Sequence, residues 1–262
     1  MRHFGLSLLL IALVPSIHWA AVKTEVVTYK VGDTTFKGHI AYDDAVKGKR
    51  PGILVVHEWW GLDDYAKKRA EQLAGMGYVA FAADLYGNGK TTEHPKEAGE
   101  MAKAVRMNAK EWLDRANGSL KVLRDHPLVD GTKLASIGYC FGGSTSLALA
   151  NSGSDIKAAV SFHGAPLIAS EDEAKKIKTR ILICHGAADA FIKEDTIQKM
   201  RSVYDRAGVD YQMIYYGGAV HSFTVPAADS KKVDGLKYDA NADRRSWAAM
   251  RALFDEVFEG RK

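Results

Sequence analysis

The chain has 262 residues, of which 47% are hydrophobic, and it carries a formal net charge of +4. This length and composition suffice for the large core of one sizeable α/β domain. Charged residues of both signs are interspersed, without a long basic run or a basic-aromatic stripe. The composition therefore argues against a nucleic-acid partner and favours a mixed, solvated surface.

The N-terminal segment differs in composition from the rest of the chain. A short basic start precedes an apolar run from Phe4 to Val14, and small residues follow at Ala20 and Ala21. This pattern is typical of a secretory signal, and the run is too short for a transmembrane helix. We predict a signal peptide at 1–21, a single domain at 22–262 and an exported protein without stable membrane insertion after signal removal. A retained N-terminal anchor is the less favoured alternative.

After this leader, strand patterns alternate with helical patterns. The strands are expected at 25–31, 36–42, 52–57, 78–83, 134–139, 158–162, 180–184 and 211–216. The helices are expected at 62–75, 98–125, 144–150, 194–207 and 241–258, with a possible break in the second near Gly118. The first two strands suit an antiparallel hairpin, and the remainder predicts an α/β fold with a mainly parallel sheet of about eight strands and helices on both faces.

A parallel sheet places its active site at the carboxyl ends of its strands. The strand that ends at Tyr139 is followed by Cys140, within the run Gly138-Tyr-Cys-Phe-Gly-Gly143. Glycines two residues before and after a central nucleophile permit a sharp strand-to-helix turn, and the helix N-terminus stabilises a thiolate there. Cys140 is therefore a candidate nucleophile, with a small core residue beside a glycine turn as the alternative.

Two further candidates follow later strands. Asp189 comes shortly after the strand at 180–184, and His221 comes shortly after the strand at 211–216. The order cysteine, aspartate, histidine matches the order of nucleophile, acid and base in the α/β-hydrolase fold. Taken singly, Asp189 could be a helix cap or turn former and His221 a surface loop residue. The joint order favours a catalytic set.

The remaining cysteine and histidines suggest less chemistry. Cys140 and Cys184 could form a disulfide in an exported chain, but a free reactive thiol with a buried bystander is the preferred interpretation. His57, His163 and His185 each end a strand, yet their spacing matches no tight metal-ligand motif. We expect them to form hydrogen bonds in the loops that frame the site, and we expect no metal.

The sequence resembles the dienelactone hydrolase family, also called carboxymethylenebutenolidases. The resemblance runs from about Gly52 to Phe258. It depends on the cysteine turn and on the runs Pro51-Gly-Ile-Leu-Val-Val-His-Glu-Trp-Trp-Gly61, Asp84-Leu85-Tyr86, His185-Gly186 with Asp189, and Val220-His-Ser-Phe223.

This resemblance implies an α/β-hydrolase fold and a Cys140–His221–Asp189 triad that needs no cofactor. It also implies that Glu58 helps to remove the thiol proton when substrate binds, although Glu58 could instead be a structural carboxylate. The backbone N–H groups of Trp59 and Phe141 would form the oxyanion hole, which agrees with the rule that the residue after the nucleophile supplies one donor.

One departure from the family concerns the substrate. The characterised dienelactone enzymes hold the substrate carboxylate with two arginines, one shortly after Asp-Leu-Tyr and one shortly after the catalytic histidine. Neither corresponding stretch of this chain contains arginine, and Lys90 could substitute only in part. Trp59, Trp60, Tyr86 and Phe223 could line a more apolar pocket, with core packing as the alternative for Trp60.

The sequence thus predicts a cysteine-dependent hydrolase of small-molecule esters or lactones that acts through an acyl-thioenzyme, on a substrate other than dienelactone. A thioesterase or peptidase of the same fold is one alternative. A non-catalytic binding protein, with Cys140 oxidised or disulfide-bonded, is another. The sequence does not indicate an oligomeric state.

Overall fold

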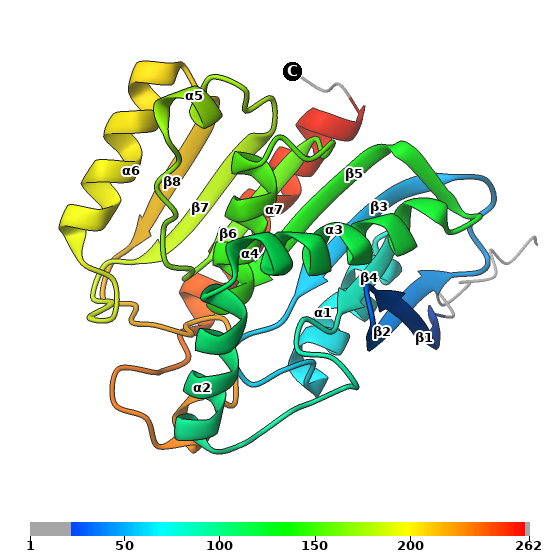
Figure 1. The fold of residues 1–262 in the computed structure, drawn as a ribbon, viewed down its shortest axis with the longest axis horizontal. Coiled ribbons are helices and arrows are strands. Elements are labelled where there is room, and N and C mark those ends of the chain that lie inside the picture. Colours follow the sequence, from blue (N-terminus) through cyan, green and yellow to red (C-terminus); the bar gives the residue numbers. More distant parts are fainter. Residues whose placement is uncertain (1–21, 260–262) are drawn as a thin grey trace, which may run out of the picture.

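The computed structural model describes residues 22–259, which form an eight-stranded sheet covered by helices on both faces (Figure 1). The spatial order of the strands is β1-β2-β4-β3-β5-β6-β7-β8. Their bounds are β1 Val22–Val31, β2 Thr34–Asp43, β3 Arg50–Val56, β4 Val79–Ala83, β5 Val129–Tyr139, β6 Ala158–Phe162, β7 Arg180–Gly186 and β8 Tyr211–Tyr216. The predicted α/β-hydrolase architecture is confirmed, and the predicted leader at 1–21 lies outside the described residues.

The sheet combines one antiparallel edge with a parallel body. β1 pairs with β2, and β2 with β4, in antiparallel register, whereas all pairs from β4 to β8 are parallel. The predicted hairpin at the start of the domain is therefore confirmed. Every residue of β4 and β6 is buried, as expected for strands that helices cover on both sides.

The helices form two layers. Their bounds are α1 Asp64–Gly75, α2 Pro95–Arg106, α3 Ala109–Asp125, α4 Phe141–Asn151, α5 Glu171–Ala174, α6 Glu194–Ala207 and α7 Ala240–Glu259, with a 3₁₀ turn at Ala228–Lys231. Apolar residues of α2, α3, α4 and α6 pack on one face of the sheet, and those of α1 and α7 pack on the other. No helix in residues 22–259 combines the length and the apolar character that crossing a membrane requires.

The long helix predicted at 98–125 is two helices, and the break does not lie at Gly118. α2 ends at Arg106, and α3 begins after Asn108, whose side chain accepts a hydrogen bond from the Glu111 N–H at 3.1 Å. Gly118 lies inside α3 against Val31 of β1, where a Cβ would overlap the valine side chain. The glycine therefore allows a close helix–strand contact, and Asn108 provides the cap that starts the second helix.

Candidate active site

Cys140 lies at the sharp turn between β5 and α4. Its φ of 51° and ψ of −110° are strained for a residue with a side chain. Gly138 and Gly142 permit the turn, because a Cβ on Gly138 would overlap the Gly142 carbonyl and one on Gly142 would overlap the Val56 carbonyl. The half-buried Cys140 side chain is thus presented at the N-terminus of a helix, as the glycine spacing predicts.

A buried histidine supports this turn. The Cys140 N–H lies 3.0 Å from the Phe162 carbonyl oxygen and 3.2 Å from Nδ1 of His163. Burial holds the pKa of His163 well below its usual range, so the ring is neutral. With Nδ1 accepting, Nε2 carries the proton and donates to Thr224 Oγ1 at 2.8 Å. The His163 side chain therefore links the cysteine turn to the loop that follows His221.

His221 and Asp189 are hydrogen-bonded beside Cys140. The distance from His221 Nδ1 to Asp189 Oδ2 is 2.7 Å, and Asp189 Oδ1 accepts from the Phe191 N–H at 2.9 Å. Burial opposes the charged form of His221, but the charge of Cys140, hydrogen bonds to Asp189 and Cys140, and the Asp189 charge outweigh it. Together they raise the His221 pKa to about 10. The structure thus joins the three side chains whose order stood out in the sequence.

The Asp84-Leu85-Tyr86 motif has a structural role in the loop after β4. The Asp84 carboxylate accepts hydrogen bonds from four backbone N–H groups, those of Lys37, Tyr86, Gly87 and Gly89. Tyr86 extends from this loop, and its hydroxyl donates to the Trp59 carbonyl oxygen at 2.9 Å. The motif therefore fixes the backbone that faces the loop after β3.

His57 holds the loop after β3 from the other side. Its Nε2 accepts from the Leu85 N–H at 3.2 Å, so Nδ1 carries the proton and donates to the Glu58 carbonyl oxygen. Burial lowers the His57 pKa and keeps the ring neutral. Two loops from neighbouring strands are thus tied together.

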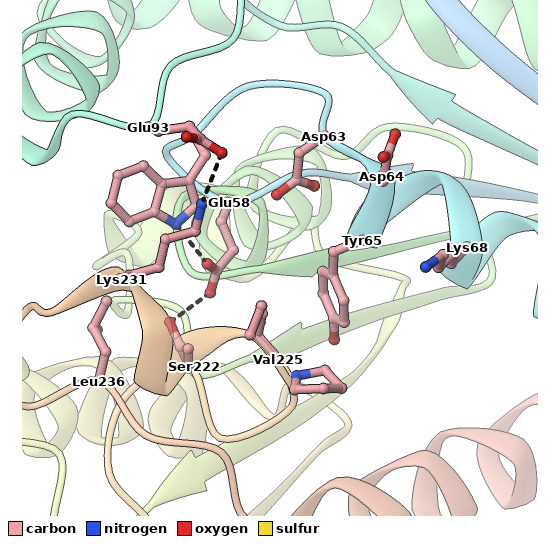
Figure 2. Close-up of a pocket in the computed structure, with 14 residues that line it drawn as sticks. Glu58, Asp63, Asp64, Tyr65, Lys68, Glu93, Ser222, Val225, Lys231 and Leu236 are labelled. Atoms are coloured by element: carbon pink, nitrogen blue, oxygen red, sulfur yellow. Dashed lines mark hydrogen bonds and ion pairs between the residues drawn. The ribbon is translucent and has the colours of Figure 1, made fainter.

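Glu58 is a buried carboxyl group with two neutral donors. Ser222 Oγ donates to Oε1 at 2.6 Å, and Trp60 Nε1 donates to Oε2 at 3.1 Å. Figure 2 shows the Glu58 carboxylate directed towards Ser222. Burial raises the Glu58 pKa, because neutral donors compensate only part of the cost of removing the carboxylate from water.

The two predicted oxyanion-hole donors flank the cysteine. Phe141 is the first residue of α4, so its N–H has no partner within the helix. Within residues 22–259, neither the Trp59 N–H nor the Phe141 N–H donates a backbone or side-chain hydrogen bond that would occupy it. Both donors are therefore free for a ligand oxygen.

Cys140 opens into two adjoining cavities. One, of about 190 Å³, contains His221 and is lined further by Trp59, Arg106, Ala165, Phe191, Ile192 and Leu236. The other, of about 390 Å³, lies against α2 and is lined by Trp59, Gly99, Ala102, Lys103, Arg106 and Met107. Apart from Trp59, none of these lining residues was predicted, because no motif marks them and only the chain's folding brings them to the cysteine.

Three predicted pocket residues lie elsewhere. Trp60 is only 2% exposed, donates to Glu58 and borders the cavity beside Glu58 rather than the two that Cys140 lines. Phe223 is fully buried in the core, with its ring edge-on to His163. Lys90 is exposed and borders neither of the cavities that Cys140 lines. Tyr86 lies between these outcomes: its ring packs on Phe141, and burial together with the charge of Cys140 raises its pKa.

Both cysteines are free thiols. Cys184 is completely buried in β7, accepts a hydrogen bond from the Tyr216 hydroxyl and has its pKa raised to about 12 by burial. A thiol in that environment stays protonated and unreactive at neutral pH. Between residues 22 and 259 there is no cluster of three or more histidine, cysteine, aspartate or glutamate side chains suited to a metal ion.

The chain is a member of the dienelactone hydrolase family, which residues 36–258 match. It is therefore a hydrolase of the α/β-hydrolase fold. It is 30% identical to the protein called usf of Aquifex pyrophilus over 88% of this chain and 98% of the relative. It is 24% identical to the carboxymethylenebutenolidase of Pseudomonas putida over 68% of this chain and 76% of that enzyme.

Solved structures show the same relationship. A dienelactone hydrolase-like promiscuous phosphotriesterase from metagenomic libraries is 39% identical, with a TM-score of 0.87 over 90% of this chain and 98% of the other. A structure named m3DLH is 41% identical, with a TM-score of 0.88 over 91% of this chain and 99% of the other.

Proposed function

We propose that the protein is a cysteine-dependent hydrolase of carboxylic esters or lactones that acts through an acyl-thioenzyme. The observation that carries this proposal is the placement of Cys140 on a strained turn at a helix N-terminus, beside a His221 that Asp189 orients. A strained nucleophile with a base and an orienting carboxylate is the arrangement that nucleophilic catalysis requires.

The reaction proceeds in two halves. The Cys140 thiolate attacks the substrate carbonyl, and the N–H groups of Trp59 and Phe141 stabilise the oxygen that becomes negative. The tetrahedral intermediate collapses as protonated His221 gives its proton to the leaving oxygen. Neutral His221 then takes a proton from water, the hydroxide attacks the thioester, and the acid product leaves with the thiolate restored.

Glu58 is proposed to accept the thiol proton before attack. Its raised pKa supports this role, because a carboxylate that resists ionisation binds a proton readily. His221 also lies close enough for its charge to favour the carboxylate form of Glu58. The proton would pass from thiol to carboxylate only when a ligand changes the contacts of either group.

The natural substrate is proposed to differ from dienelactone. The loop after β4 carries glycine and asparagine where the family has an arginine, and Val225 follows His221 in the other stretch and lines the cavity beside Glu58. The cavity that holds His221 is bordered mainly by apolar side chains. This lining supports esters with an apolar group on the side of His221.

Neutral phosphotriesters are a second candidate substrate class. The similarity to a promiscuous phosphotriesterase at 39% identity over most of both chains supports this candidate. A phosphoryl centre would occupy the same position beside Cys140 as a carbonyl carbon.

The test compares two cysteine variants on an activated ester. Cys140→Ala should abolish turnover, whereas Cys184→Ala, which removes the buried thiol, should retain it after correction for any loss of folded protein. Equal turnover in wild type and Cys140→Ala would exclude the thiol mechanism. Absence of turnover in all three across esters and lactones would favour a binding protein.

A further inference from the structure

Arg106 brings a positive charge to the mouth of the candidate active site. It ends α2 and borders both of the cavities that Cys140 lines. Its guanidinium carbon lies 5.3 Å from the centre of the ring of Phe141, which is the residue that follows the nucleophile Cys140. This cation–π contact holds the charged group beside the cavity wall.

The positive charge at this position is not neutralised by the protein. Across residues 22–259, neither Arg106 nor Lys103, one turn earlier on α2, forms an ion pair, although Arg69, Arg115 and Arg180 each pair with a carboxylate. Arg106 is exposed and Lys103 borders only the cavity against α2. Two cations near one cavity without a partner form a favourable environment for an anion.

The position of His221 orients a substrate across the two cavities. His221 borders only the smaller cavity, with the apolar side chains of Phe191 and Ile192. Because His221 must protonate the leaving oxygen, the alcohol half of an ester belongs in that cavity. The acyl half then extends into the cavity against α2, towards Lys103 and Arg106.

We infer that Arg106, assisted by Lys103, selects esters whose acyl half carries a second, free carboxylate: half-esters of dicarboxylic acids with an apolar alcohol. The inference rests on the proposed cysteine mechanism and adds to it the substrate class and the direction of binding. A planar guanidinium binds a carboxylate through two parallel hydrogen bonds, which lysine does not reproduce.

The test uses two esters that differ only at the end of the acyl chain. 4-Nitrophenyl glutarate and 4-nitrophenyl valerate have acyl chains of equal length, and a carboxylate in the first replaces a methyl group in the second. We expect wild-type protein to prefer the glutarate ester in kcat/KM after subtraction of spontaneous hydrolysis. Arg106→Met should reduce that preference by about tenfold, mainly through KM, as expected for a lost charge-assisted contact at a partly exposed site.

Matched variants separate recognition from helix stability. Lys96→Met removes a positive charge from the exposed first turn of the same helix and should keep the preference. Arg106→Lys should restore part of it, and added salt should weaken it in wild type. If Arg106 only stabilised the C-terminus of α2, the melting temperature would fall while the ratio of the two substrates stayed unchanged.

The carboxylate preference and the cysteine mechanism are refuted by different results. Cleavage of both esters at rates that Arg106→Met lowers equally would overturn the inference and leave the cysteine mechanism intact. Turnover of neither ester, with no acyl group on Cys140, would overturn the proposed function and the inference together.

Discussion

Asp189→Asn tests how the carboxylate controls His221, because an amide has nearly the same shape as a carboxylate. Asp189 Oδ1 accepts from the Phe191 N–H, and Oδ2 faces His221 Nδ1 at 2.7 Å. An asparagine that keeps the Phe191 bond turns an N–H towards Nδ1. The imidazole must then accept at Nδ1, which disfavours the imidazolium that protonates the leaving oxygen, and Nε2 keeps its proton and cannot take one from water.

The magnitude follows from the His221 pKa, which rises from 6.5 to about 10. This rise stabilises the imidazolium by about 5 kcal/mol at about 1.36 kcal/mol for each pH unit. Cys140 is the larger influence, so we assign roughly 2 kcal/mol to Asp189, within the range of about 1.5–3 kcal/mol for a hydrogen bond to a charged group. Losing this hydrogen bond should lower kcat/KM by about 30-fold and lower the His221 pKa relative to wild type.

The assay is the pH dependence of kcat/KM for an activated ester between about pH 5 and about pH 11, in wild type and Asp189→Asn. Wild type should lose activity as His221 deprotonates near pH 10, and the variant should lose it more than one pH unit lower. The melting temperature confirms that both proteins are folded. An unchanged rate together with an unmoved alkaline limb would refute the role assigned to Asp189.

Three further predictions follow from the same contacts. Glu58→Gln, which can still accept from Trp60, should slow turnover yet raise the free energy of unfolding at pH 7, because burial raises the Glu58 pKa and the fold therefore favours a neutral group; lower stability in chemical denaturation would contradict this. Gly138→Ala should destabilise the protein by more than about 3 kcal/mol, whereas Gly217→Ala, with open space around it, should be nearly neutral; equal melting temperatures would refute the steric reasoning. Since the folded pKa of His221 is raised, its contribution to stability is complete below pH 6.5 and is lost as the pH rises through about 10. Urea unfolding measured between pH 6.5 and about 10 should show this decline in the free energy of unfolding, and Cys140→Ala should make the free energy depend less on pH.

The sequence predicted the fold, and it singled out three side chains that the structure brings together, because these signals are local. Strand ends, glycine spacing and residue order place Cys140, Asp189 and His221 along the chain, and a parallel sheet brings strand ends to one edge. The start of α3 has a local signal that the predicted single helix missed, since Asn108 three residues before Glu111 is an N-terminal capping pattern. Gly118 was misinterpreted as a break because its contact with β1 is not a local property.

The lining of the cavities could not be predicted in the same way. Arg106 lies 34 positions before Cys140 in the sequence, and only the packing of α2 against the sheet brings the two together. Phe223 and Trp60 are aromatic residues beside site residues, yet Phe223 is fully buried and Trp60 borders the cavity beside Glu58 instead of those that Cys140 lines. Position in the sequence therefore identifies the candidate reacting groups better than it identifies the residues that line the cavities around them.

The most direct test of the central claim is the mass of the Cys140 peptide after rapid acid quenching of a reaction with an activated ester. A His221→Ala variant, which deacylates slowly, should increase the trapped fraction. We expect a mass increase equal to one acyl group on the peptide that contains Cys140, and none in Cys140→Ala. Steady turnover with an unmodified Cys140 peptide, or an acyl group on another residue, would contradict it.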